Sequence, residues 1–216
     1  MKAFKRISVP LLLAVLVLIP FWELIWLPTD QVVAGRDIDF MFLQWWRFGL
    51  ESARQGELPL WNPNLFSGVP FLANPQPAHF YPPVWLMWVL PATRLVGVLI
   101  VFHIWLSGLG MYGWLRREGA ERMGALFGGV IYAFSGYFAV RIFAGHLGVV
   151  MTLAWLPMLY WAYKVALQRN SYAAAVLAGI VMALAFLAGH TASFLYLGLA
   201  LAAYALCQAW KLSLIH

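Results

Sequence analysis

Two neighbouring aspartates are the residues of this sequence that most invite a chemical role. Six of the eight acidic residues lie between Glu23 and Glu57, and Asp37 and Asp39 stand inside that stretch. A carboxylate can act as a general base toward a hydroxyl group. Asp is also favoured at the start of a helix, where its side chain caps the first turn. The residue type alone therefore leaves catalysis and capping open for both aspartates.

Arginines supply the positive charge that a phosphate would need. Arg36, Arg47, Arg94 and Arg141 are candidates, because guanidinium groups bind phosphate oxygens through paired N–H donors. Arg141 lies at the end of an apolar segment, close to Gly145-His146. The alternative for Arg141 is that its side chain extends to lipid headgroups.

Histidines form a third group. Ala144-Gly145-His146 is echoed by Ala188-Gly189-His190, which suggests a weakly repeated helical hairpin, and His79 precedes both. Three imidazoles and a carboxylate could bind a divalent metal, whereas isolated histidines at a membrane boundary form local hydrogen bonds. Nothing in the spacing selects the metal, so we assign no metal or cofactor. His103 lies within an apolar segment, where we expect a packed, neutral side chain.

The segments that position these residues are strongly apolar. The 216 residues are 63% hydrophobic and 10% charged, with mean hydropathy +0.79. A water-soluble globule cannot bury such a composition, so the sequence predicts an integral membrane protein. The net charge of +6 comes from small basic clusters between apolar runs. These clusters indicate membrane topology and not nucleic-acid binding.

Apolar runs predict an all-α, polytopic membrane protein with about six transmembrane helices in one domain, residues 1–216. The runs are long enough to cross a bilayer. The first lacks a signal-peptidase site, which favours an uncleaved anchor that begins at Pro10 and is kinked at Pro20. The predicted spans are 9–27, 95–115, 124–143, 147–166, 172–188 and 191–210.

Basic residues predict the orientation of these spans. With a cytoplasmic N-terminus, nine Lys and Arg residues fall inside and five outside. This bias follows the positive-inside rule. We therefore expect a multi-pass protein of the bacterial cytoplasmic (inner) membrane, with the large loop 28–83 on the outer face.

The first half of that loop has helical periodicity. Gln44, Arg47, Glu51 and Arg54 fall on one stripe, and apolar residues occupy the remaining positions. The pattern predicts an amphipathic helix near 38–55 that lies in the membrane interface, with Trp45 and Trp46 at the level of the lipid headgroups.

The second half of the loop is rich in proline. Seven prolines occur from Pro59 to Pro83, a density that regular helices and strands do not tolerate. Trp61, Phe71 and Tyr81 make the segment too apolar for a disordered linker. We expect a rigid, packed loop, and ordered long loops are commonly functional.

Short motifs in this region resemble those of bacterial YfhO-like membrane proteins. They include Gly35-Arg36-Asp37, the run from Gly56 to Pro63, the run from Gly68 to Gln76, and Phe80-Tyr81-Pro82-Pro83. The resemblance continues through Phe134-Ser135-Gly136, Gly145-His146 and Gly189-His190, so it covers most of the chain. That family is similar to the GT-C glycosyltransferases, which take a sugar from a polyprenyl-phosphate carrier on the outer face.

The resemblance implies a role for each candidate. Asp37 matches the catalytic Asp of the first outer loop in GT-C enzymes, and Asp39 is the reserve candidate. The carrier phosphate would be held by a basic set: Arg36, Arg47, Arg94, Arg141, His146 and His190. The acceptor, an envelope polymer, lipid or protein, would lie against the loop residues Trp61, Asn62, Asn74, Gln76, His79 and Tyr81.

Two departures from the family pattern stand out. Thr191-Ala192 follows the last Gly-His where family members often have Pro-Gln, and family members are several times longer. We therefore expect the N-terminal part of a longer enzyme. Two other functions are compatible with the sequence: a transporter or flippase of a lipid-linked substrate, and a non-catalytic membrane scaffold.

Overall fold

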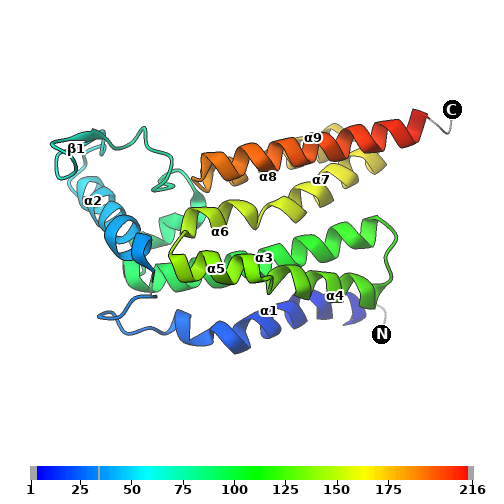
Figure 1. Ribbon diagram of the computed structural model, residues 1–216, viewed down its shortest axis with the longest axis horizontal. Coiled ribbons are helices and arrows are strands. Elements are labelled where there is room, and N and C mark those ends of the chain that lie inside the picture. The colour runs from blue at the N-terminus through cyan, green and yellow to red at the C-terminus, as the bar shows by residue number, and fades with distance from the viewer. Residues whose placement is uncertain (1–3, 34, 214–216) are drawn as a thin grey trace.

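A computed structural model describes residues 4–33 and 35–213, and these form a bundle of helices with an irregular loop at one end (Figure 1). Between the first helix and the rest of the bundle lie a π-helix, an α-helix, two short strands and a 3₁₀-helix. The elements, in chain order, are α1 (Phe4–Ile25), η1 (Ile38–Phe42), α2 (Leu43–Arg54), β1 (Trp61–Asn62), β2 (Val69–Pro70), η2 (Pro82–Trp88), α3 (Ala92–Arg117), α4 (Arg122–Ala133), α5 (Gly136–Ala144), α6 (Leu147–Leu153), α7 (Leu156–Arg169), α8 (Tyr172–Leu187) and α9 (Thr191–Ser213).

Four helical segments are long and apolar enough to cross a membrane, namely 92–117, 122–144, 147–169 and 191–210. Two shorter apolar helices, Val9–Ile25 and Tyr172–Leu187, accompany them. The prediction of a mostly helical chain is confirmed, and these long apolar helices are compatible with a membrane protein. Two expected spans are interrupted: the helix breaks at residues 134–135 between α4 and α5, and at residues 154–155 between α6 and α7. Pro157, in the first turn of α7, has no backbone N–H to continue the ladder from α6.

The predicted start of the first helix is wrong. Helix α1 begins at Phe4, so Pro10 lies inside it together with Pro20. The carbonyl oxygen of Pro10 accepts a hydrogen bond of 3.1 Å from the indole nitrogen of Trp105 on α3. This contact joins the first helix to the centre of the bundle.

Helix α3 lies at the centre of the bundle and packs against α1, α4, α6 and α7. Small residues allow this close approach. A Cβ at Gly108 would lie 3.2 Å from the carbonyl oxygen of Gly129, and one at Gly110 would lie 2.7 Å from the backbone nitrogen of Met158. Gly124, in contrast, has open space around it.

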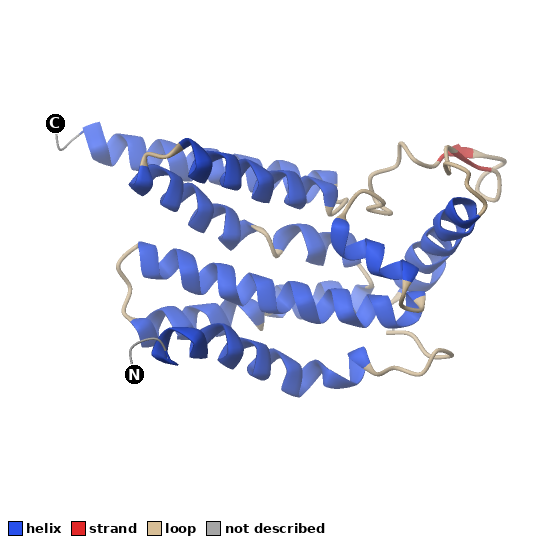
Figure 2. Cartoon of the chain, turned by 180° about the vertical axis from the view of Figure 1, so that it is seen from behind, coloured by secondary structure: helices blue, strands red, loops and turns tan. Residues whose placement is uncertain are grey.

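The turns and loops gather at two opposite ends of the bundle (Figure 1). At one end lie the long loop with α2, the turn between α5 and α6, and the turn between α8 and α9. At the other end lie the beginning of α1, the turns after α3 and α7, and the end of α9. The view from behind shows the two strands held beyond the first of these ends (Figure 2).

The amphipathic segment forms η1 and α2, close to the predicted range 38–55. Its polar stripe is exposed, as expected: Gln44, Arg47, Glu51 and Arg54 all face outward. Its tryptophans differ from the prediction, because Trp45 and Trp46 are buried inside the protein and not at a lipid-facing surface. The indole nitrogen of Trp46 donates to the carbonyl oxygen of Pro77, 2.9 Å away, which fixes α2 to the proline-rich loop.

The proline-rich loop is packed, as the sequence predicts. Phe71, Ala78 and Tyr81 belong to the hydrophobic core, and Phe71 lies edge-on against Phe48 of α2. Regular structure, which we did not expect here, is limited to the two-residue antiparallel strands β1 and β2 and to η2. Prolines explain that limit, since each removes a backbone donor.

Candidate functional site

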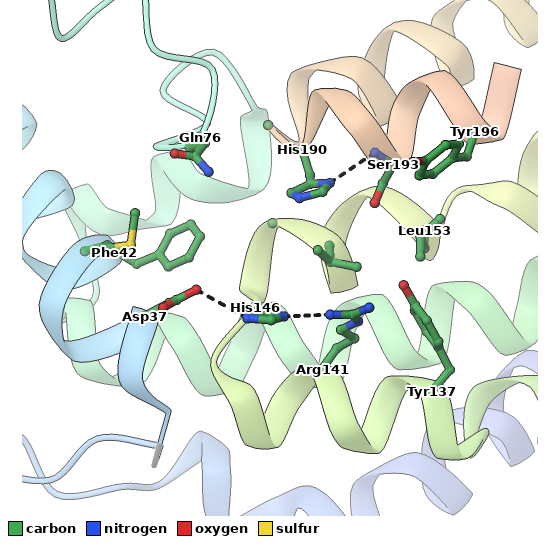
Figure 3. Close-up of a pocket in the computed structure, with 14 residues that line it drawn as sticks. Asp37, Phe42, Gln76, Tyr137, Arg141, His146, Leu153, His190, Ser193 and Tyr196 are labelled. Carbon is green, nitrogen blue, oxygen red and sulfur yellow. Dashed lines mark hydrogen bonds and ion pairs between the residues drawn. The ribbon is translucent and has the colours of Figure 1, made fainter.

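Distant parts of the sequence meet around a cavity of about 300 Å³ at the loop end of the bundle (Figure 3). That volume is within the range of small-molecule sites. One wall comes from η1, a second from α5 and α6, and a third from the start of α9. Its polar side chains are those of Asp37, Gln76, Tyr137, Arg141, His146, His190, Ser193 and Tyr196.

Close backbone packing positions Asp37 at this cavity. Gly145 ends α5 in a left-handed conformation with φ +80°, which glycine adopts without strain. A Cβ at Gly145 would lie 2.9 Å from the carbonyl carbon of Gly35 and 3.0 Å from the backbone nitrogen of Asp37. The missing side chain therefore lets Gly35-Arg36-Asp37 lie directly against Gly145-His146.

The second Gly-His pair is built in the same way. Gly189 also has a positive φ, +98°, and a Cβ there would lie 2.6 Å from the carbonyl oxygen of Pro75. The turn between α8 and α9 thus packs against the loop beside Gln76, whose side chain reaches the cavity. The repeated Gly-His motif places one histidine on each side of the cavity, His146 at the start of α6 and His190 at the start of α9.

Arg141, His146 and Asp37 form a chain of polar contacts (Figure 3). The guanidinium NH1 of Arg141 lies 2.9 Å from Nδ1 of His146, and Nε2 of His146 lies 3.5 Å from Oδ2 of Asp37. A guanidinium only donates, so Nδ1 of His146 is the acceptor. The imidazole hydrogen is therefore on Nε2, toward the carboxylate. Arg141 also lies over the ring of Tyr137, 5.0 Å from its centroid.

His190 closes the opposite side of the cavity. Its Nδ1 accepts a hydrogen bond of 3.1 Å from the backbone nitrogen of Ser193, in the first turn of α9. Burial lowers the pKa of His190, and the electrostatic influence of the neighbouring His146 and Arg141 lowers it further. His190 is thus held neutral with its hydrogen on Nε2, which makes it a donor that carries no charge of its own.

The capping role for Asp37 has no support in the geometry. Asp37 immediately precedes η1, yet its carboxylate makes no capping hydrogen bond. The π-helix that follows is a rare form that often marks functional sites. Asp39 lies in the first turn of η1, is exposed, and does not line the cavity.

The other predicted phosphate ligands lie elsewhere. Arg36 is exposed beside Asp37 but does not line the cavity. Arg47 lines a separate hollow between α2 and the start of α3. Arg94 donates from Nε to the carbonyl oxygen of Leu27, 3.1 Å away, which ties α3 to the segment after α1.

Of the predicted acceptor-groove residues, Gln76 lines the cavity and the others shape the loop. Asn62 and Asn74 accept hydrogen bonds from the backbone nitrogens of Asn64 and Gln76, which stabilises two turns. Trp61 covers Gly68, where a Cβ would lie 2.4 Å from the indole nitrogen.

His79 and Tyr81 belong to the packed interior of the loop. His79 packs against Phe71, and burial lowers its pKa to about 4. Burial raises the pKa of Tyr81, whose hydroxyl donates to Nε2 of His103 at 2.7 Å. The same hydroxyl accepts from the indole of Trp155 at 2.8 Å, and Nδ1 of His103 donates to the carbonyl of Leu99. His103 is fully buried with both nitrogens paired, as expected of a packed, neutral side chain.

Sequence reasoning missed Tyr137, Ser193 and Tyr196. Tyr137 could have been found, because it lies four residues before Arg141 and so on the same helical face. Ser193 is three residues after His190, the spacing of a helix cap. Tyr196 carries no such signal, since its apolar surroundings resemble those of any membrane helix.

The arrangement offers a carboxylate, a guanidinium and neutral histidine donors around a space open to one small polar group. Within the described residues, no group of three or more His, Cys, Asp or Glu side chains is arranged to hold a metal ion. The donors suit an anion beside a hydroxyl whose proton Asp37 could accept.

Comparison of the chain with known protein families, with curated proteins and with solved structures found no match.

Proposed function

We propose that this chain is a GT-C-type membrane glycosyltransferase, or the N-terminal part of one, that transfers a sugar from a polyprenyl phosphate to an envelope acceptor. One observation carries the proposal: Asp37, Arg141, His146 and His190, from three distant segments, line a single cavity. The donor class comes from the resemblance to YfhO-like proteins.

The transfer needs one base and one cation. The acceptor hydroxyl oxygen attacks the anomeric carbon, its proton passes to Asp37, and the bond from that carbon to the phosphate oxygen breaks. The phosphate is already a good leaving group, so no second carboxylic acid is needed to protonate it, unlike in glycoside hydrolysis. Arg141 stabilises the negative charge that develops on the departing phosphate.

His146 serves as a positioning residue in this scheme. Its Nε2–H points toward Asp37, and Arg141 holds that tautomer by donating to Nδ1. The contact keeps the carboxylate turned into the cavity. His190 and Gln76, on the opposite wall, would orient the phosphate or the sugar through hydrogen bonds.

We further propose six membrane crossings, with the N-terminus in the cytoplasm and the site on the outer face of a bacterial inner membrane. Helix α8, with 16 residues, extends about 24 Å at 1.5 Å per residue. This is less than a hydrocarbon core of about 30 Å. Local thinning of the bilayer accommodates helices that are short by this amount.

The competing transporter hypothesis requires ionisable groups available at mid-membrane. His103 lies within α3, and both of its nitrogens are engaged in protein hydrogen bonds. The scaffold hypothesis predicts a protein with no turnover at all.

The test is sugar transfer from a labelled polyprenyl-phosphate sugar to a hydroxyl acceptor, with the full chain reconstituted in liposomes. Loss of a general base lowers turnover by about 10²- to 10⁴-fold, so Asp37→Asn should show that loss. Asp39→Asn is the matched control, because Asp39 is exposed and outside the cavity.

Transfer that survives in Asp37→Asn and is lost in Asp39→Asn would move the base to Asp39. Full activity in both variants would show that neither Asp37 nor Asp39 is the general base. Absence of transfer by the native chain with every donor tested would favour the scaffold hypothesis.

A further inference from the structure

A second cavity, of about 340 Å³, lies at the other end of the bundle, between α7 and α8. Its walls are apolar along most of their length, from Trp155 at the start of α7 to Val165 and Leu177. The lining residues run along α7 from Trp155 to Arg169, so the cavity follows this helix as an apolar slot. An extended hydrocarbon chain is the kind of group that suits such walls.

Two arginines line the end of this slot with the carbon atoms of their side chains, and both side chains are exposed. Arg117 is the last residue of α3 and Arg169 is the last residue of α7. Among the described residues, no carboxylate lies within ion-pair distance of either guanidinium, and Nη1 of Arg117 donates to the amide oxygen of Gln168 at 3.2 Å. The nearby carboxylate of Glu118 is engaged by Lys164 at 3.1 Å. Positive charge that the described carboxylates do not neutralise therefore lies beside the end of the slot.

We propose that this slot binds one anionic phospholipid from the surrounding bilayer. One acyl chain lies along α7 and α8, and the phosphate contacts Arg117 and Arg169. An apolar chain alone would leave the charges of the two arginines unneutralised, and a soluble anion would leave the apolar wall exposed. The occupant is therefore an amphiphile with a negative headgroup. This site is separate from the Asp37 cavity and does not depend on the proposed transfer.

The test measures lipid binding to the purified full chain by native mass spectrometry and by thermal unfolding in detergent. Added phosphatidylglycerol should leave one bound lipid and raise the unfolding temperature, while phosphatidylcholine should do neither. Arg117→Gln/Arg169→Gln should weaken phosphatidylglycerol binding by about tenfold or more, since two charge-assisted contacts are lost. Arg116→Gln is the matched control, because Arg116 is exposed and donates to the carbonyl oxygen of Ala120.

A second variant tests the slot itself. Ala162→Leu/Ala174→Leu adds bulk to two lining positions and keeps both arginines, so it should also abolish retention of the lipid. Retention by this variant would show that surface charge alone attracts the lipid, and the proposal would be wrong. Equal retention of both lipids, or undiminished binding in the double arginine variant, would overturn it as well.

Discussion

At the scale of single residues, the state of the candidate site depends on which nitrogen of each histidine carries its hydrogen. Arg141 determines this for His146, and the backbone nitrogen of Ser193 determines it for His190. In both cases Nδ1 accepts and Nε2 is left to donate. The site therefore presents donors toward an anion and keeps one carboxylate, that of Asp37, as a proton acceptor.

The hydroxyl of Tyr81 offers a direct test of the buried polar network. Tyr81→Phe removes the donor to His103 and the acceptor for Trp155, which leaves two buried groups without partners. We expect a loss of about 2–6 kcal/mol in the free energy of unfolding, because each of the two orphaned groups costs about 1–3 kcal/mol. Denaturant unfolding in detergent micelles measures the change. Tyr172→Phe is the control, since Tyr172 is 94% exposed; equal stability of the two variants would contradict the network.

His79 gives a pH dependence whose sign can be worked out. Its pKa falls from 6.5 in the unfolded chain to about 4 in the folded protein because of burial. Between these values the unfolded chain binds the proton and the folded chain does not, so the free energy of unfolding falls as the pH falls from 6.5 to 4. The lowered pKa of His79 changes the free energy of unfolding by about 3 kcal/mol over this pH range.

The measurement is unfolding at several pH values for the native chain and for His79→Gln. The variant should lose less stability on acidification, and other titrating groups cancel in the comparison. Identical slopes for the two proteins would show that His79 is not held neutral by burial.

At the scale of elements, two left-handed glycines bring the walls of the cavity together. Gly145 packs against Gly35 and Asp37, and Gly189 packs against Pro75 and Gln76. Each glycine combines a helix end with a close approach to the long loop. The π-helix η1 then follows Asp37 and leads into α2, which Trp46 fixes to the loop.

Gly145→Ala should therefore damage both folding and function. The Cβ added at Gly145 would lie 3.0 Å from the backbone nitrogen of Asp37. Gly145 also has a positive φ, and a side chain held in that conformation costs about 1–3 kcal/mol. We expect lower stability in thermal unfolding and a loss of sugar transfer, because Asp37 must move away from His146. Gly136→Ala is the matched control, since Gly136 has open space around it. Equal stability and equal sugar transfer in the two variants would show that the close contact at Gly145 does not position Asp37.

At the scale of the whole molecule, the two ends of the bundle carry different chemistry. Asp37, the Gly-His pairs and the packed loop share one end, and Arg117, Arg169 and the paired Lys164 share the other. Along the sides, Thr191–Trp210 is apolar, yet only 11% of the residues in its most apolar stretch are buried. Lipid is the solvent that suits such a surface.

The proposed orientation can be measured by labelling. In a Cys207→Ser background, Gln76→Cys should react with an impermeant maleimide added outside intact cells, because Gln76 is exposed on the loop. Glu121→Cys, exposed in the turn after α3, should react only after the membrane is opened. The reverse labelling pattern would show that the orientation is opposite to the proposed one and that the candidate site faces the cytoplasm.

The sequence by itself determined the mostly helical, apolar architecture, the extents of the apolar helices to within several residues, and the packed character of the proline-rich loop. These properties depend on local composition and periodicity, which a chain carries wherever it folds. The sequence also supplied Asp37, Arg141, His146 and His190 as candidate site residues. It also placed Pro10 at the start of a helix and Trp45 and Trp46 at the lipid surface, where the structure differs.

Only the tertiary structure decided which of the nominated residues lie together. Arg47 and Arg94 have the same chemistry as Arg141, yet the first lines another hollow and the second holds the segment after α1. Trp46 turns inward because α2 packs against the loop through Pro77, a partner 31 residues away. Contacts at such separations depend on how helices and loops pack in three dimensions, and periodicity along one segment carries no information about them.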